Sequence, residues 1–251
     1  MKKIVLSLVL ATAFIAGCDD KFAELDPSTA GYDYYPLEVG DYRIYDVTNI
    51  RFLHNVGDTT RFQMRELVDT TFIDQTNTVN YKIIRSIRAD DNSEWQEDSV
   101  MVVTKSLTNV ILTKDNTKYV KMVFPVKEGK KWAADMYNTH TIPEEKRNDF
   151  MSDRDPFKIK EPSTFIDVDK PYSVGGKSYT NTVTIIQGTP IDPIMGIDDR
   201  KEVYAKGIGR VYRIFNRATF APCAPNQCAF GEQFKLDGHE RHEVLVSYGK
   251  E

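Results

Sequence analysis

The segment YRIYDVTNIRF, residues 42–52, is rich in the β-branched and aromatic residues that favour strands. Turn residues follow it at Asn55, Gly57 and Asp58, and a second run of the same kind extends over residues 61–73. Two such runs joined by a short turn predict a β-hairpin, because a connection of this length joins antiparallel neighbours.

The same pattern recurs along most of the chain, and helical periodicity is almost absent. Short runs rich in Val, Ile, Thr, Tyr and Phe alternate with clusters of Gly, Asp, Asn and Pro, which is typical of an all-β protein. Further hairpin turns are predicted at residues 89–93, 114–117 and 175–176. The predicted strands are residues 42–52, 61–73, 80–88, 99–105, 110–113, 119–124, 164–168, 179–187, 202–205, 209–215 and 243–248. The expected fold is all-β and mainly antiparallel: a curved sheet, a half-barrel or a sandwich with one short helix.

The sequence supports more specific predictions for two segments, residues 119–124 and 141–150. In residues 119–124, Val120, Met122 and Phe124 share a face opposite Lys121, so this strand is expected to be half solvated. The helix is predicted at residues 141–150, where a proline is followed by acidic and then basic side chains. It lies in a charged excursion at about 138–162, which is either a lid or a packing element.

Residues 1–17 have the plan of a signal peptide. Lys2 and Lys3 precede an apolar run, residues 4–15, which is too short to cross ~30 Å of hydrocarbon. The run ends in IAGC, residues 15–18, which resembles the bacterial lipobox. The resemblance implies cleavage before Cys18, lipidation of its sulfur and nitrogen, and anchoring to a lipid bilayer through these acyl groups. The alternative is an ordinary signal peptide with an incidental cysteine.

Residues 18–35 are polar and rich in turn formers, which predicts a flexible tether after the acylated cysteine. A single β-rich domain is expected over residues 36–251. The acidic residues of the tether also resemble the short signal of surface-exposed lipoproteins in Bacteroidetes, and a solvated linker explains them equally well. We expect an exported protein that is anchored to the outer membrane, on its periplasmic or cell-surface face.

Cys223 and Cys228 flank a Pro-Asn turn in a loop at about 216–236. In an exported protein this spacing predicts a disulfide that pins the loop locally. A metal site is the alternative, and it needs further ligands. His239 and His242 lie downstream, but three residues apart on a strand they face opposite sides.

Composition and motifs exclude several functions. The chain has 251 residues, 41% of them hydrophobic, and a net charge of −4, which argues against nucleic-acid binding. The sequence contains no complete dinucleotide fingerprint, no phosphate-binding loop, no Gly-x-Ser-x-Gly and no His-Glu-x-x-His. We therefore expect no cofactor, no metal ion and no catalysis. A hydrolase would need paired carboxylates; the candidate pairs are Asp90-Asp91, Asp167/Asp169 and Asp198-Asp199.

Aromatic side chains give the better indication of function. Trp95, Trp132 and Tyr137 lie near predicted strand ends, where rings either pack in the core or line a concave site for a small molecule, lipid or glycan. The favoured function is a noncatalytic domain that binds a ligand or an envelope protein. An accessory or structural subunit of an envelope complex and a carboxylate-based hydrolase are the alternatives.

Three motifs carry a family resemblance: YPLEVGDYRIY at 35–45, FPVKEGKKW at 124–132 and YAKGIGRV at 204–211. With the lipobox and the acidic linker, they resemble a family of uncharacterised exported lipoproteins of Bacteroidetes. The motifs are similar to structural turns of a β-rich domain, and the resemblance implies no activity. Residues 216–236, with the cysteine pair, depart from what the family resemblance implies and look like an insertion. By analogy of fold alone, such domains resemble the open half-barrel of periplasmic lipoprotein carriers.

Overall fold

The computed structural model describes residues 29–137, 162–188, 196–221 and 233–251. These residues form one antiparallel sheet and one short 3-10 helix, η1 (Tyr32–Tyr34). The strands are β1 (Asp41–Leu53), β2 (Val56–Ile73), β3 (Val79–Arg88), β4 (Gln96–Lys105), β5 (Asn109–Lys114), β6 (Thr117–Val123), β7 (Lys131–Trp132), β8 (Ser163–Val174), β9 (Lys177–Gly188), β10 (Gly196–Ala205), β11 (Gly209–Phe220) and β12 (Lys235–Lys250). The predicted all-β antiparallel fold is confirmed.

The sheet consists of two meanders joined edge to edge. Strands β1 to β6 pair in sequence, as do β7 to β12, and β1 pairs with β12 to give the order β6-β5-β4-β3-β2-β1-β12-β11-β10-β9-β8-β7. The central pairing runs from Asp41 opposite Lys250 to Leu53 opposite Asp237, which places the start of β1 beside the C-terminus.

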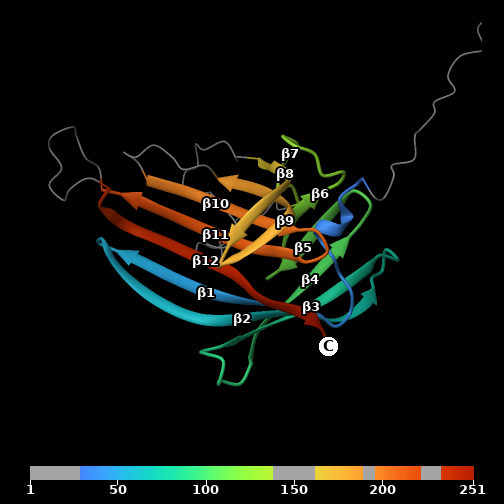
Figure 1. The fold of residues 1–251 in the computed structure, drawn as a ribbon, viewed down its shortest axis with the longest axis horizontal. Coiled ribbons are helices and arrows are strands. Elements are labelled where there is room, and N and C mark those ends of the chain that lie inside the picture. Colours follow the sequence, from blue (N-terminus) through green and yellow to red (C-terminus); the bar gives the residue numbers. More distant parts are fainter. Residues whose placement is uncertain (1–28, 138–161, 189–195, 222–232) are drawn as a thin grey trace, which may run out of the picture.

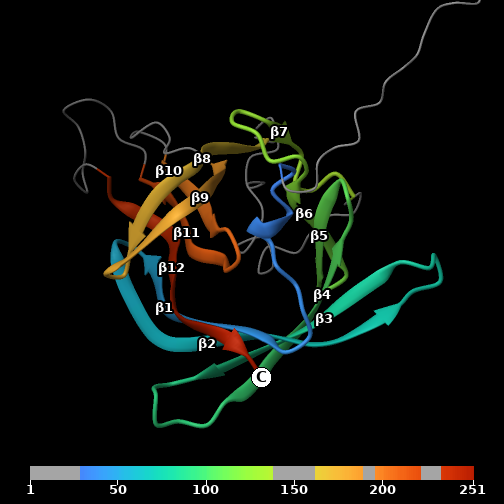
Figure 2. The ribbon, with the colours of Figure 1, turned by 45° about the vertical axis from the view of Figure 1, so that its right-hand side comes forward.

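The sheet curls until strands far apart in its order face each other (Figure 2). Lys121 of β6 forms an ion pair across the interior with Glu202 of β10. The two outer strands also approach, because Nε1 of Trp132 donates to the carbonyl of Val120 at 2.9 Å, and the amide of Val120 donates to Ala134. The half-barrel is the nearest of the predicted shapes, but the contact between the outer strands nearly closes it; we keep the name half-barrel for this nearly closed sheet.

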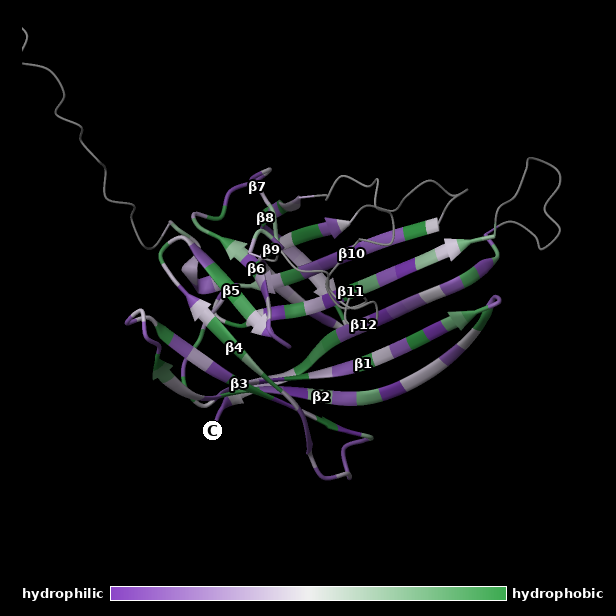
Figure 3. Ribbon diagram, turned by 180° about the vertical axis from the view of Figure 1, so that it is seen from behind, coloured by the Kyte–Doolittle hydropathy of each residue, from purple (hydrophilic) through white to green (hydrophobic). Residues whose placement is uncertain are grey.

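Hydrophobic and hydrophilic residues alternate along many of the strands (Figure 3), as expected where successive side chains point to opposite faces of a sheet. The main core cluster draws on strands β2 to β10 and contains Val68, Met101, Val103 and Phe165, all at most 3% exposed. The expectation that residues 119–124 are half solvated is wrong. Lys121 is buried because its strand curves over the interior, where an opposite charge receives it.

Residues 30–37 cross the mouth of the half-barrel, and we call this segment the strap. On one side, Lys105 of β4 donates to the carbonyls of Tyr32 and Tyr35 at 2.8 and 2.7 Å. On the other, the hydroxyl of Tyr34 donates to Asp169 of β8 at 2.8 Å. Figure 2 shows η1 of the strap between the β4–β6 side and the β8–β11 side.

The strap corrects the predicted boundary of the tether, which was placed at residues 18–35. Ala30 and Tyr34 are buried, so the domain begins before residue 36. The polar composition of this segment misled the prediction because its polar groups are satisfied inside the half-barrel. Gly31 takes a left-handed φ of 78° at the start of η1, where an added Cβ would lie 2.9 Å from a methyl of Val126.

The predicted strands are confirmed, and several are longer than expected. β10 and β12 begin at Gly196 and Lys235, ahead of the predicted 202 and 243, because their polar residues pair across the strands. The two-residue strand β7 was not predicted. Residues 216–220 and 235–236, expected in the disulfide loop, belong to β11 and β12.

Several predictions lie outside the described residues. These are the signal peptide and Cys18, most of the tether, most of the excursion with its helix at 141–150, and the Cys223/Cys228 disulfide. In the part of the chain that the structure describes, no helix is long and apolar enough to span a membrane.

Candidate functional site

The interior of the half-barrel contains a network of charged side chains, built first around Glu66 of β2. Glu66 lies opposite Arg43 of β1 and opposite Arg85 of β3. Its Oε1 is 2.8 Å from Nη2 of Arg85, an arrangement in which facing opposite charges stabilise neighbouring strands. Arg43 donates instead to the carbonyls of Pro36 and Ile208, and so links the strap to the β10–β11 turn.

A second row crosses the other half of the sheet. Arg213 of β11 lies opposite Glu202 of β10 and opposite Glu243 of β12. Nη1 of Arg213 donates to Oε1 of Glu243 at 2.9 Å, and its Nε lies 3.6 Å from Oε1 of Glu202. Three neighbouring strands thus carry acidic, basic and acidic side chains at facing positions, all buried.

Arg210 joins the two rows. Its Nη2 lies 3.2 Å from Glu66 and 2.9 Å from Glu243. On a regular strand, Arg210 and Arg213 would point to opposite faces. The register of β11 against β10 shifts by one residue at Val211, and this bulge lets both guanidiniums reach the network.

Lys121 and Tyr204 complete the site from opposite sides. The Nζ of Lys121 lies 2.5 Å from Oε1 of Glu202, whose other oxygen accepts a hydrogen bond from the hydroxyl of Tyr204. The ring of Tyr204 packs against Tyr35 of the strap, with centroids 5.7 Å apart. Lys121 and Glu202 are only 5% and 1% exposed, so this pair is shielded from solvent.

The carboxylates of this network are held in their ionised form. Burial alone raises the pKa of Glu202, but neighbouring cations, Lys121 first among them, outweigh burial and lower the pKa to about 2. Burial is likewise outweighed by Arg210 at Glu243 and at Glu66, so the pKa of each lies below its ordinary value. Burial lowers the pKa of Lys121, an effect that Glu202 opposes.

These shifts predict loss of stability in acid. Glu202 has a pKa of about 2 in the folded protein against an ordinary 4.5, so the unfolded chain binds more protons between these values. The contribution of Glu202 to the free energy of unfolding is fully present above pH 4.5. It is lost progressively as the pH falls from 4.5 through 2, by on the order of 3 kcal/mol in total. Urea unfolding at pH 7, 5, 4 and 3 measures the decline. Glu202→Gln should flatten it, and an equal slope in this variant would contradict the assignment.

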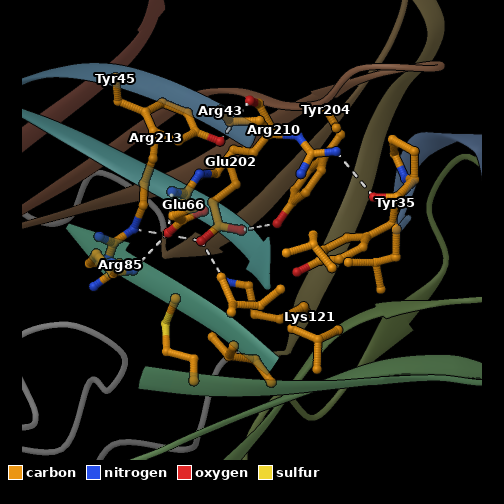
Figure 4. A pocket seen from close by; sticks show the side chains of 18 residues that line it. Tyr35, Arg43, Tyr45, Glu66, Arg85, Lys121, Glu202, Tyr204, Arg210 and Arg213 are labelled. Carbon is orange, nitrogen blue, oxygen red and sulfur yellow. Dashed lines mark hydrogen bonds and ion pairs between the residues drawn. The ribbon is translucent and has the colours of Figure 1, made fainter. Parts of the chain in front are cut away.

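A cavity of about 50 Å³ lies between the charged network and an apolar wall (Figure 4). The wall consists of Val68, Ile83, Met101, Val103 and Leu112 from strands β2 to β5. The strap closes the cavity with its residues 35–37. The volume suffices for a few waters or one small polar group, because a drug-sized ligand fills several hundred Å³. The cavity is thus a small site with one charged side and one apolar side.

Two buried donors at this cavity lack an acceptor. Neither Nε of Arg85 nor Nε of Arg210 has a hydrogen-bond partner among the described residues. Both guanidiniums contact the same oxygen, Oε1 of Glu66, and therefore lie side by side. A buried donor without an acceptor costs free energy, so these two mark the part of the site that is suited to a ligand.

The three aromatic residues predicted to face a ligand are not brought together. Trp132 is buried against Phe165, with ring centroids 4.5 Å apart. Trp95 lies in the β3–β4 connection, where the guanidiniums of Arg65 and Arg88 approach its ring. Cζ of Arg88 is 4.4 Å from the ring centroid. Tyr137 is exposed. None of the three lines the interior cavity; the rings that do are Tyr35, Tyr45 and Tyr204.

None of the predicted acid pairs lines the interior cavity. Asp90 and Asp91 are exposed on a turn, where Asp90 accepts from Ser93 and Asn92. Asp198 is bound by Arg200 through both oxygens, at 2.5 and 3.0 Å.

Asp169 accepts from Tyr34 and pairs with Lys206, while Asp167 pairs with Lys170. A carboxylate hydrolase needs a protonated acid beside an ionised partner. The three carboxylates of the charged network, Glu66, Glu202 and Glu243, all have lowered pKa values, so none of them meets that need.

Sequence reasoning missed every residue of the charged network. For Lys121 the available signal was a single charge inside an apolar run, VKMV at 120–123, which is a candidate for burial with an opposite charge. Glu202 carries no such signal, because it directly follows the charged run DDRK at 198–201. No cluster of three or more metal-ligating side chains occurs within residues 29–137, 162–188, 196–221 and 233–251.

Comparison with known proteins gives one structural likeness. No protein-family model and no curated protein matches the sequence. A solved structure from Bacteroides fragilis, a "putative exported protein with YmcC-like fold", aligns with a TM-score of 0.39 and 12% identity, covering 86% of this chain and 98% of that one. Nothing about function is transferred at this similarity, so the function must be argued from the site.

Proposed function

We propose that this chain is an exported lipoprotein, anchored through Cys18, whose half-barrel is a noncatalytic ligand-binding domain. The observation that carries the proposal is the interior cavity, which has buried donors on one side and aliphatic side chains on the other. Binding sites commonly combine an apolar lining with a few polar groups that fix orientation. Catalysis is not proposed, because the carboxylates of the charged network lack the raised pKa of a general acid.

Thermal unfolding tests the binding function. The full chain carrying Cys18→Ala, purified without detergent, is unfolded with increasing concentrations of a neutral glycan, a neutral alkyl alcohol, an alkyl phosphate or inorganic phosphate. A ligand that binds only the folded state raises the melting temperature progressively with concentration. At least one class should do so, and the rise should be lost in Met101→Phe, which fills the cavity. Val100→Phe on the outer face of the same strand is the matched control. Absence of any rise would contradict the proposal.

The membrane anchor gives a separate prediction. Cys18→Ala removes the nucleophile that would carry the acyl chains, so the protein should move from the membrane fraction to the soluble fraction of a cell lysate. Metabolic labelling with a fatty acid should mark the wild type alone. A Cys18→Ala protein that stays with the membranes would show that the lipobox interpretation is wrong.

The accessory-subunit function remains a second candidate, favoured by apolar hairpin tips. Leu53 and Val56 are exposed where β1 meets β2, as are Ile73 and Val79 where β2 meets β3. Pull-down of the lipidated protein from cross-linked membranes, compared with Leu53→Ser/Val56→Ser, tests it. A partner retained by the wild type and lost by the variant would favour this function.

A further inference from the structure

The cavity is surrounded by an excess of cations. Its lining includes Arg43, Arg85, Lys121, Arg210 and Arg213, and only two carboxylates, Glu66 and Glu202. Glu243 adds a third carboxylate behind Arg210 and Arg213. Buried charge is costly unless it is paired, so this lining favours an anionic occupant over a neutral or cationic one.

The two unpartnered donors give the anion a defined position. Arg85 is about nine-tenths buried, and its Nε and that of Arg210 have no acceptor in the described part of the chain. Each already uses one terminal nitrogen on Glu66, which fixes the plane of its guanidinium. Two neighbouring guanidiniums with free N–H groups match a carboxylate or phosphate, whose oxygens accept several charge-assisted hydrogen bonds.

We infer that the interior cavity binds the oxyanion group of a ligand, a carboxylate or a phosphate, between Arg85 and Arg210. This inference rests on the proposed ligand-binding function and specifies its chemistry. The cavity volume of about 50 Å³ fits one such group and little more. Two sources share this chemistry: a free inorganic anion, and the head of an amphiphile whose apolar chain lies along the aliphatic wall.

The strap determines which source fits. Tyr35, Pro36 and Leu37 of the strap belong to the lining of the cavity, and Tyr35 and Leu37 pack against the apolar core cluster that contains Val68 and Val103. A free anion occupies the cavity with the strap in place. A long apolar chain exceeds the cavity volume of about 50 Å³, so an amphiphile must displace part of the lining, and the strap is the part of the lining that lies outside the sheet.

Isothermal titration separates these sources. The full chain with Cys18→Ala is titrated with sodium phosphate, decyl phosphate and decanol, each below its aggregation limit and at constant ionic strength set with sodium chloride. Saturable binding of inorganic phosphate that is at least as tight as that of decyl phosphate supports the inference with a free anion as ligand. Binding of decyl phosphate at least tenfold tighter than inorganic phosphate supports it with an amphiphile.

Two outcomes overturn the inference in distinguishable ways. Decanol binding as tightly as decyl phosphate would show an apolar site, so the oxyanion inference fails while the ligand-binding function stands. Binding of none of the three probes refutes the oxyanion inference. If the glycan of the thermal panel also gives no rise in melting temperature, the proposed function fails with it.

Variants locate the site. Arg85→Met keeps the aliphatic stem and removes the donors, so it should weaken phosphate binding by about tenfold or more. Arg65→Met is the matched control, because Arg65 also has a buried Nε without a partner but does not line the cavity. If Arg85→Met does not fold, Arg85→Lys retains a charge beside Glu66 and removes the Nε donor, with the same expected weakening. Equal affinities in the Arg85 and Arg65 variants would overturn the assignment.

Discussion

Tyr34→Ala will lower the free energy of unfolding by ~3–5 kcal/mol, the range for removing a large buried aromatic side chain. The side chain is 1% exposed in the main core cluster, and its hydroxyl donates to Asp169 at 2.8 Å and to the carbonyl of Thr182 at 3.2 Å. The effect is large because Tyr34 sits in the strap, which connects the two sides of the half-barrel. Urea unfolding of the Cys18→Ala protein measures it.

Two controls separate the parts of this effect. Tyr34→Phe keeps the ring and removes the hydroxyl, so it should cost only about 1 kcal/mol. Tyr137→Ala removes the same side chain from an exposed position, and its effect should stay within about 0.5 kcal/mol. If Tyr34→Ala were as mild as Tyr137→Ala, the strap would not be an integral part of the domain.

Glu202→Gln will destabilise the protein by ~3–5 kcal/mol, because it removes the carboxylate of a buried ion pair while the cations stay. Glu202 accepts from Tyr204 and faces both Lys121 and Arg213. The exposed pair of Glu38 with Lys250 provides a matched control, and Glu38→Gln should leave the unfolding midpoint nearly unchanged.

A double-mutant cycle tests the cross-interior contact itself. Lys121→Met combined with Glu202→Gln should lower the free energy of unfolding by less than the sum of the two single changes, with a difference of at least about 1 kcal/mol. Each single change leaves one charge of the pair without its partner, whereas the double change removes both charges. Additive effects would mean that the two side chains do not interact. Such a result would also contradict the closed curvature of the half-barrel, since Lys121 and Glu202 belong to β6 and β10.

Local sequence patterns predicted the strands well, since strand propensity and turn chemistry act between residues close in the chain. The hairpin from β1 to β2, for example, was evident from residues 42–52, the turn residues and 61–73. Such local patterns failed at the strap, whose polar groups are satisfied by hydrogen bonds to a strand 70 or more residues away.

The sequence by itself determined the all-β class, the antiparallel hairpins and their turns, and it predicts the lipidated N-terminus. Only the tertiary structure decided that the sheet curls into a half-barrel, that residues 30–37 cross its mouth, and that charges from seven strands meet inside. The bulge at Val211 is an example: it changes the face of the sheet to which Arg210 points, and no pattern in the sequence marks it. The register between strands and the curvature of the sheet arise from contacts between distant residues, which a linear pattern does not contain.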